Sequence, residues 1–234
     1  MSDFFQPPPP PPPEERVRHR QPAWAGPPHG MLPGIVPLEL VLARSELAAV
    51  YVSWLGAYPT GFEFDLMTVA APSEDDDALD PMLFGARRHH MRRRGTGAAI
   101  PDAMLRFGVE FADGRRATNT GGRALPGSHA EPDEGPVLHS GGGGGGGGRW
   151  HQEMFLWPLP PPGPLALVCE WPAAGIPLTR HDIDTGRVRE AAQRAQVMFE
   201  DDPGAHAPGA IWSTITAAGG TESDAAPPQA TTPD

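Results

Sequence analysis

Histidine and carboxylate side chains supply the best candidates for chemistry in this chain. His151 and Glu153 are two residues apart within an apolar stretch, a spacing that places both side chains on one face of a β-strand. Imidazole titrates near neutral pH, so the pair could bind a small ligand or transfer a proton. The alternative is that both are exposed polar residues of a strand. Further candidates occur in separate segments that only the fold could bring together: His129, His139, His181 and Glu170.

Two blocks of opposite charge follow each other between residues 72 and 101. The second block is rich in arginine and contains Arg87, Arg88, Arg92, Arg93 and Arg94. Guanidinium groups suit phosphate oxygens, so this block is a candidate polyanion site, with weak and salt-dependent binding. The first block, SEDDDALD at 73–80, lacks the ligand spacing and the glycine of an EF-hand loop, which argues against a divalent metal. The favoured interpretation of the whole segment is a long mobile loop in which the two blocks can fold back on each other, and the polyanion site is the alternative to it.

Sequence motifs that fix a reaction are absent from the chain. There is no nucleophile elbow, zinc-protease helix, phosphate-binding loop or dinucleotide fingerprint. Cys169 is the single cysteine, so an intramolecular disulfide is excluded and a cysteine-based zinc site has too few ligands. The sequence therefore predicts no metal and no cofactor, and it leans against an enzyme without excluding one.

The net charge of −11 is concentrated toward one end of the chain. Six acidic side chains and no arginine lie from Glu200 onward. Phosphate repels a chain of this sign, so nucleic acid is not the expected partner. No window approaches the ~20 apolar residues that cross a bilayer, and no basic segment followed by an apolar one opens the chain. We therefore expect a cytoplasmic protein with no membrane contact.

Low-complexity segments flank the part of the chain that can fold. Residues 1–30 include an unbroken proline run at 7–13, and residues 201–234 are polar and acidic. Neither arm can bury enough apolar surface to offset the entropy of ordering it, so we expect both to be disordered. A single domain is expected at 31–200. Another protein is the expected partner, contacted through the proline-rich or the acidic arm.

Alternating apolar and polar residues predict a series of antiparallel strands. Three runs near 35–43, 50–55 and 62–66 follow one another with short turns between them. A further strand is expected at 104–111, where alternate apolar residues share one face. Asp113 and Gly114 come next, and this pair favours a type I′ turn that returns the chain along 115–119.

The most apolar stretch runs from residue 149 to residue 171 and predicts two strands joined by a proline-rich turn. We expect the arms, 150–157 and 165–171, to form a hairpin in the core. Alternation in the second arm turns four side chains inward: Leu165, Leu167, Cys169 and Trp171. Eight glycines at 141–148 precede the stretch, and we interpret them as a flexible tether.

The period of the pattern changes from two to 3.6 over residues 182–199, which predicts one amphipathic helix. Asp184 is the expected N-cap, and Ile183 is expected to pack on Val188 as a hydrophobic staple. The predicted fold is therefore mainly β: an antiparallel β-sandwich of about seven or eight strands. The C-terminal helix is expected to pack on a sheet face or across an open end.

Three motifs give the chain a resemblance to known sequences. They are LRFGVEFADGR at 105–115, the junction of polyglycine with Arg149 and Trp150, and WPLPPPGPL running on to CEWPAAGIP at 157–177. In these motifs the chain resembles a family of uncharacterised actinobacterial proteins, over most of 35–199. The family has no assigned activity, so the resemblance implies a shared fold and transfers no catalytic residue.

Two classes of function are compatible with these patterns. The favoured one is a non-enzymatic interaction or scaffolding module, because the chain combines one core with arms of the kind that recruit partners. The alternative is a small enzyme or ligand-binding β domain whose site is assembled from scattered histidine and carboxylate residues. A deep cleft that gathers these residues would favour the alternative, whereas a flat face would favour the interaction module.

Overall fold

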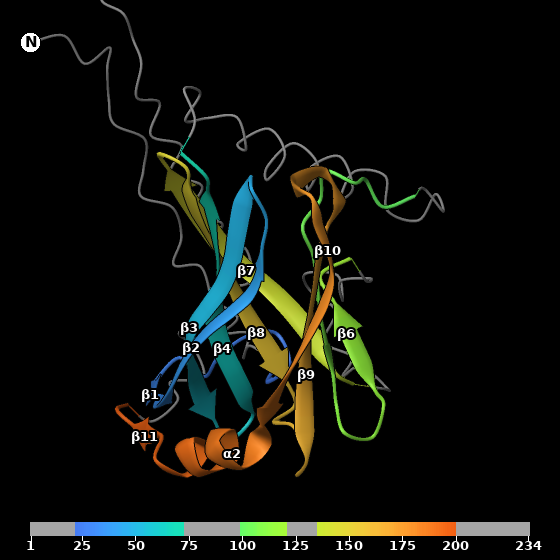
Figure 1. The fold of residues 1–234 in the computed structure, drawn as a ribbon. Coiled ribbons are helices and arrows are strands. Elements are labelled where there is room, and N and C mark those ends of the chain that lie inside the picture. The colour runs from blue at the N-terminus through green and yellow to red at the C-terminus, as the bar shows by residue number, and fades with distance from the viewer. Residues whose placement is uncertain (1–21, 73–98, 121–134, 200–234) are drawn as a thin grey trace, which may run out of the picture.

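The computed structural model describes residues 22–72, 99–120 and 135–199. Within them the fold is mainly β and antiparallel, with eleven strands in three sheets, one α-helix and a 3-10 turn at Pro172–Ala174. Figure 1 shows two larger sheets facing each other as a sandwich, with the helix lying across their lower end. The predicted class is thus confirmed, and eleven strands replace the expected seven or eight.

The larger sheet has five strands in the order β2-β3-β4-β8-β7. The strands are β2 Gly34–Arg44, β3 Ala48–Tyr58, β4 Gly61–Ala70, β8 Arg149–Trp157 and β7 Val137–Gly146. The three consecutive strands predicted first are confirmed as β2, β3 and β4, each paired antiparallel with the next. Ser45 shapes their first turn, since its Oγ accepts hydrogen bonds from the N–H groups of Leu47 and Ala48, both at 3.1 Å.

The smaller sheet has four strands in the order β10-β9-β5-β6. They are β10 Ile176–Asp184, β9 Pro164–Trp171, β5 Arg106–Glu110 and β6 Arg116–Thr118. The hairpin predicted at Gly114 joins β5 to β6, but its turn is not type I′. Gly114 has φ 85° and Asp113 is not among the residues with positive φ, whereas type I′ requires positive φ at both central positions. Phe111 and Arg115 close a three-residue loop, of the kind built on a type I turn followed by a left-handed glycine.

The predicted central hairpin of 150–157 and 165–171 does not form. Strand β8 pairs with β4 and β7, whereas β9 pairs with β5 and β10, so the two arms belong to opposite sheets. The proline-rich segment between them carries the chain from one sheet to the other. Alternation determines which side chains of a strand are buried, and it does not determine the strand's neighbour.

The eight glycines are part of the sheet, so their interpretation as a flexible tether is wrong. Residues 141–146 lie in β7, and residues 143–146 pair in register with residues 152–149 of β8. Gly147 and Gly148 make the two-residue turn with φ values of 59° and 73°, the positive pair that a type I′ turn needs. The Ala70 N–H donates to the Gly148 carbonyl at 2.7 Å, which ties this turn to the end of β4.

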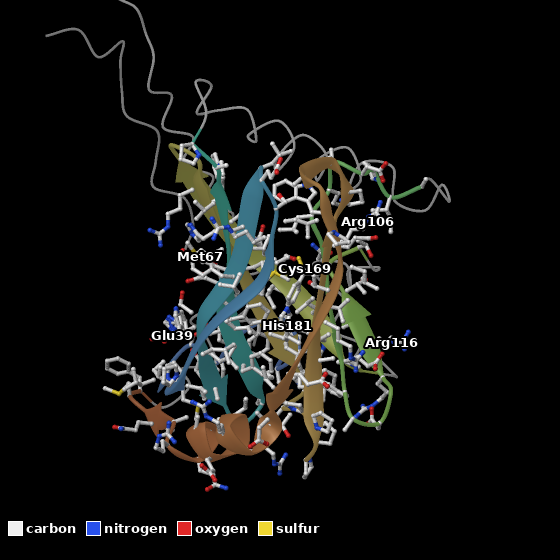
Figure 2. The ribbon with its side chains drawn as sticks, in the orientation of Figure 1. Glu39, Met67, Arg106, Arg116, Cys169 and His181 are labelled. Carbon is white, nitrogen blue, oxygen red and sulfur yellow. The ribbon has the colours of Figure 1, made fainter. Side chains whose placement is uncertain are left out.

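The core lies between the two larger sheets. The predicted inward face of β9 is confirmed, because Leu165, Leu167, Cys169 and Trp171 are each at most 1 % exposed. Phenylalanine rings join the sheets: the centroid of Phe64 is 5.5 Å from that of Phe107 on β5. Figure 2 shows Cys169 in this interior.

The helix α2, Thr185–Gln193, is shorter than the predicted 182–199. Asp184 is its N-cap, as predicted, and its carboxylate accepts a hydrogen bond from the Gly186 N–H at 2.8 Å. The residues before the cap pair with β9, so Ile183 belongs to β10. The periodic stripe also ends early: Val188 is buried, whereas Met198 and Phe199 are 55 % and 78 % exposed.

A two-stranded ribbon lies beside the helix and joins the two ends of the described chain. It consists of β1 Met31–Leu32 and β11 Gln196–Val197. Residues 22–30 precede the predicted start of the domain, yet the structure describes them and Trp24 is only 6 % exposed. The other residues of the two predicted arms, 1–21 and 200–234, lie outside the described part of the chain.

Candidate functional site

The outer face of the five-stranded sheet carries the candidate site. Phe62, Phe64 and Leu66 of β4 are buried in the core, so the residues between and after them face outward. Asp65 is directly opposite Glu153 of β8, and Met67 is opposite His151. The predicted pair, His151 and Glu153, thus shares one strand face as expected. We call Glu63, Asp65 and Glu153 the carboxylate face.

Tyr58 and Glu63 form the most buried part of this face. The Tyr58 hydroxyl donates to Glu63 Oε1 over 2.6 Å. Burial raises the pKa of Glu63, and the negative charges of Asp65 and Glu153 add to this effect, while the hydrogen bond from Tyr58 opposes it. Burial, followed by the bond to Glu63 and its charge, also raises the pKa of Tyr58. The phenol therefore stays protonated and acts as a donor.

The groups around Asp65 have opposite effects on its pKa. Burial raises the pKa of Asp65, the nearby His151 lowers it, and the charge of Glu153 raises it again. In the part of the chain that the structure describes, no arginine forms an ion pair with Glu63, Asp65 or Glu153. The carboxylate face is therefore a site of partly buried, mutually repelling negative charge.

Glu153 extends from β8 over the glycines of β7. Its Oε2 accepts a hydrogen bond from the Gly142 N–H at 3.0 Å. A β-carbon added to Gly141 or Gly142 would lie 3.0 Å or 3.2 Å from the same oxygen, so the carboxylate would have to shift by a few tenths of an ångström to make room for a side chain there. Gln152 fixes the strand beneath it by donating to the carbonyls of Gly141 and Gly142, at 3.0 Å and 2.7 Å.

Strand β7 ends the five-stranded sheet, so one of its two edges pairs with no strand among residues 22–72, 99–120 and 135–199. Residues 143, 145 and 146 are exposed and Gly144 is half-buried. An unpaired edge presents a row of N–H and C=O groups that can pair with another extended chain. We call residues 143–146 the glycine edge.

Of the other histidines and carboxylates singled out from the sequence, His139 lies on the outer side of the same sheet, whereas His181 and Glu170 lie elsewhere. His139 of β7 is opposite Phe155, on the same side of the sheet. His181 of β10 lies between the two sheets, as Figure 2 shows, with its Nε2 2.7 Å from the Leu42 carbonyl oxygen. His129 and the five candidate arginines, which are Arg87, Arg88, Arg92, Arg93 and Arg94, lie outside the described residues.

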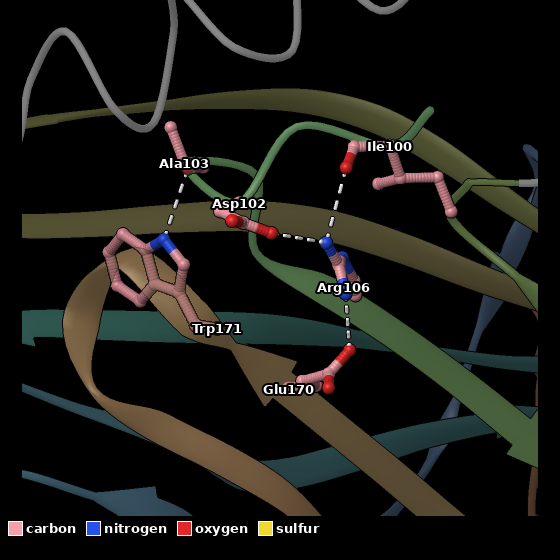
Figure 3. Close-up of polar contacts among 6 residues, drawn as sticks. All are labelled: Ile100, Asp102, Ala103, Arg106, Glu170 and Trp171. Carbon is pink, nitrogen blue, oxygen red and sulfur yellow. Dashed lines mark hydrogen bonds and ion pairs between the residues drawn. The ribbon is translucent and has the colours of Figure 1, made fainter. Parts of the chain in front are cut away.

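Glu170 belongs to an ion-pair cluster on the four-stranded sheet. Arg106 of β5 donates from Nη1 to Glu170 at 2.6 Å and from Nη2 to Asp102 at 3.0 Å. Figure 3 shows both contacts, together with the indole N–H of Trp171 donating to the Ala103 carbonyl at 3.0 Å. These bonds fasten the segment before β5 over the core, which is a structural role.

Sequence reasoning missed three members of the site, Tyr58, Glu63 and Asp65. Alternation along β4 predicts that Glu63 and Asp65 face outward, and that signal was present. The pairing of β4 with β8 brings together residues almost ninety positions apart, as in Asp65 with Glu153. No local pattern in the sequence encodes that pairing.

The change in the free energy of unfolding caused by Asp65→Asn is expected to be more favourable at pH 7 than at pH 4. A carboxyl whose pKa is raised by folding holds more protons in the folded state, so its contribution to stability falls as pH rises above its unfolded pKa of about 4. Asparagine does not titrate, so the variant does not lose this stability as pH rises. The measurement is the urea midpoint at both pH values.

Asp113→Asn is the matched control for the Asp65 variant. Hydrogen bonds and charge from Arg115 lower the pKa of Asp113, so its contribution is present at neutral pH and is lost as pH falls. This variant should lose more stability at pH 7 than at pH 4, the opposite sign. Equal pH profiles for Asp65→Asn and the unchanged protein would contradict the proposed burial of Asp65.

Cys169 is expected to be unreactive in the folded protein. The residue is fully buried, and burial followed by the charge of Glu170 raises the pKa of its thiol to about 12. Because the thiolate is the reactive form, a native-state labelling reaction with a thiol reagent should proceed only as fast as the protein unfolds. Complete labelling within the mixing time, without denaturant, would show that β9 is accessible.

Two further properties concern the described residues alone. No group of three or more histidine, cysteine, aspartate or glutamate side chains among them is arranged to hold a metal ion. In the same ranges, no helix has the length and apolar character that a bilayer crossing requires.

The resemblance to the actinobacterial family stays a prediction. Comparison with protein-family models, with curated proteins and with solved structures finds no match to this chain.

Proposed function

We propose that this protein is a non-enzymatic interaction module that binds an extended segment of a protein partner along the glycine edge. The observation that carries the proposal is the exposed terminal position of β7, in which residues 143–146 have no side chains. Peptides that add a strand to a sheet gain affinity from main-chain hydrogen bonds. Glycine leaves those bonding groups open to an approaching backbone.

The extent of the edge limits the strength of such binding. Four residues pair with β8 beyond the irregularity at residues 141 and 142. A partner strand would gain roughly two to four main-chain hydrogen bonds there, each worth about 1 kcal/mol net. Side-chain contacts must supply the remaining affinity, so we expect a weak, reversible contact.

A second candidate function is a small enzyme or ligand-binding domain with acid–base groups on the carboxylate face. The raised pKa values of Glu63 and Asp65, together with the 2.6 Å bond from Tyr58, favour it. The exposed position of His151 and Glu153 on a sheet face favours the interaction module, because catalysis generally requires a site that excludes water. The cytoplasmic location and the partner contacts of the two arms remain predictions from the sequence.

The test of the proposed function uses an eight-residue peptide of alternating valine and threonine with blocked ends. Added to the full-length, ¹⁵N-labelled protein, it is expected to shift the amide signals of residues 143–146 and to leave those of β2, the other terminal strand of this sheet, unchanged. The control is the same peptide with every backbone nitrogen methylated, which keeps the side chains and removes the donors. Equal binding of the methylated peptide, or no shift in β7, would refute strand addition.

A further inference from the structure

We infer that the segment accepted by the glycine edge carries arginine or lysine at the positions that face the outer side of the sheet. This inference rests on the proposed function and names the chemistry of its partner. It is carried by two independent observations: the carboxylate of Glu153 lies over β7, and the strand beneath it has no side chains at residues 141–146.

The geometry brings a cation on the added strand within reach of Glu153. Neighbouring strands are about 4.8 Å apart, so a strand paired with β7 would lie about 10 Å from β8. The Glu153 carboxylate already spans part of this gap, since its Oε2 is hydrogen-bonded to Gly142 of β7. Arginine and lysine have the long side chains needed to cover the rest, and no β7 side chain stands between the two groups.

The aromatic ring of His151 leaves the same path open. Its Cε1 would be 3.8 Å from a β-carbon added to Gly144, an ordinary contact distance, so the ring borders the glycine edge without covering it. Asp65 is directly opposite Glu153 on the next strand, and it adds negative charge behind the first carboxylate. An arginine or lysine side chain that lies over β7 therefore faces the carboxylate of Glu153, with that of Asp65 behind it.

The charges on this face select against an anionic segment. Arg149 shares the outer face of β8, but its Nη2 is 3.1 Å from the Tyr51 hydroxyl on β3, on the side of the sheet away from β7. Burial and mutual repulsion disfavour the charged forms of Glu63 and Asp65, as their raised pKa values indicate. A cation relieves this repulsion, whereas an additional carboxylate increases it.

The experiment compares three eight-residue peptides in which valine alternates with arginine, threonine or glutamate. Binding to the full-length protein is measured by amide shifts of residues 143–146 at low salt. The arginine peptide is expected to bind at least tenfold more tightly than the glutamate peptide, with the threonine peptide between them. The preference should decrease at high salt, because exposed charges are screened.

Charge variants identify the groups that are responsible. In the double variant Glu153→Gln and Asp65→Asn, the preference for arginine over glutamate should fall to within about twofold. The matched control, Glu46→Gln with Glu190→Gln, removes two exposed carboxylates at other places and should keep the tenfold preference. The single variant Asp65→Asn gives an intermediate result and serves if the double variant does not fold.

The outcomes separate this inference from the proposed function. If the threonine peptide shifts β7 and arginine gives no advantage, the charge preference is wrong and strand addition stands. If no peptide shifts residues 143–146, the proposed function itself fails. An arginine preference that is retained in the double variant would assign the cation to other carboxylates and overturn the inference.

Discussion

Trp171→Ala is expected to lower the free energy of unfolding by about 3–5 kcal/mol, the usual cost of truncating a buried aromatic side chain. Trp171 is fully buried at the end of β9. Its indole N–H also holds the Ala103 carbonyl at 3.0 Å, so the change removes both core packing and the anchor of the segment before β5. Because the whole stability of a domain is about 5–15 kcal/mol, chemical denaturation should show a protein close to unfolding.

Two controls separate these contributions. Trp171→Phe keeps most of the packing and loses the indole donor; because Ala103 is half-buried, the cost should be about 0.5–1.5 kcal/mol, the net contribution of a typical hydrogen bond. Trp54→Ala truncates a half-buried indole on β3 and should cost less than Trp171→Ala. A Trp171→Ala variant as stable as Trp54→Ala would contradict the central position of β9.

Deletion of four glycines, residues 141–144, is expected to lower the free energy of unfolding by about 2–4 kcal/mol, rather than the few tenths expected of a shortened flexible tether. The hairpin of β7 and β8 loses its pairing at residues 143 and 144, and the turn can no longer lie at Gly147 and Gly148. The estimate assumes the loss of roughly three or four hydrogen bonds at about 1 kcal/mol each. Urea denaturation measures it.

Single alanine substitutions in the same tract provide matched controls. A β-carbon on Gly145 would lie 2.1 Å from the Arg149 carbonyl oxygen, so Gly145→Ala should be destabilising. Gly146→Ala meets nothing within 4 Å and should be neutral or stabilising, by about 0.4–1 kcal/mol, because alanine restricts the unfolded chain. Equal effects of the two substitutions, or a harmless four-residue deletion, would show that residues 141–146 do not form a strand.

The buried faces of the strands were predictable from the sequence, whereas strand partners were not. Alternation in β9 correctly turned Cys169 and Trp171 inward, because a two-residue period is a local property of any strand with one buried face. The same pattern gave no information on pairing, so β8 and β9 were joined in one hairpin although they lie in opposite sheets. The prediction of a flexible tether rested on the glycine composition. It was wrong because pairing with β8 outweighs the low strand propensity of glycine.

The candidate site was predictable only in part, for the same reason. His151 and Glu153 were identified from their spacing within one strand. Asp65 faces Glu153 only because β4 and β8 are neighbours, which depends on the packing of the whole sandwich. The glycine edge gave no chemical signal in the sequence. Its binding groups are backbone N–H and C=O groups, which are not particular to any residue type.

The irregularity in β7 has a consequence for inherited variation in the length of the glycine tract. Two residues, Gly141 and Gly142, stand opposite the single residue Glu153, so the tract is one residue longer than a regular ladder requires. Loss of one glycine codon would remove this extra residue and leave the pairing at residues 143–146 and the turn intact. Loss of further codons would shorten the strand itself. We therefore expect the loss of one glycine codon to have little effect on the stability of the protein, and the loss of further codons to be destabilising.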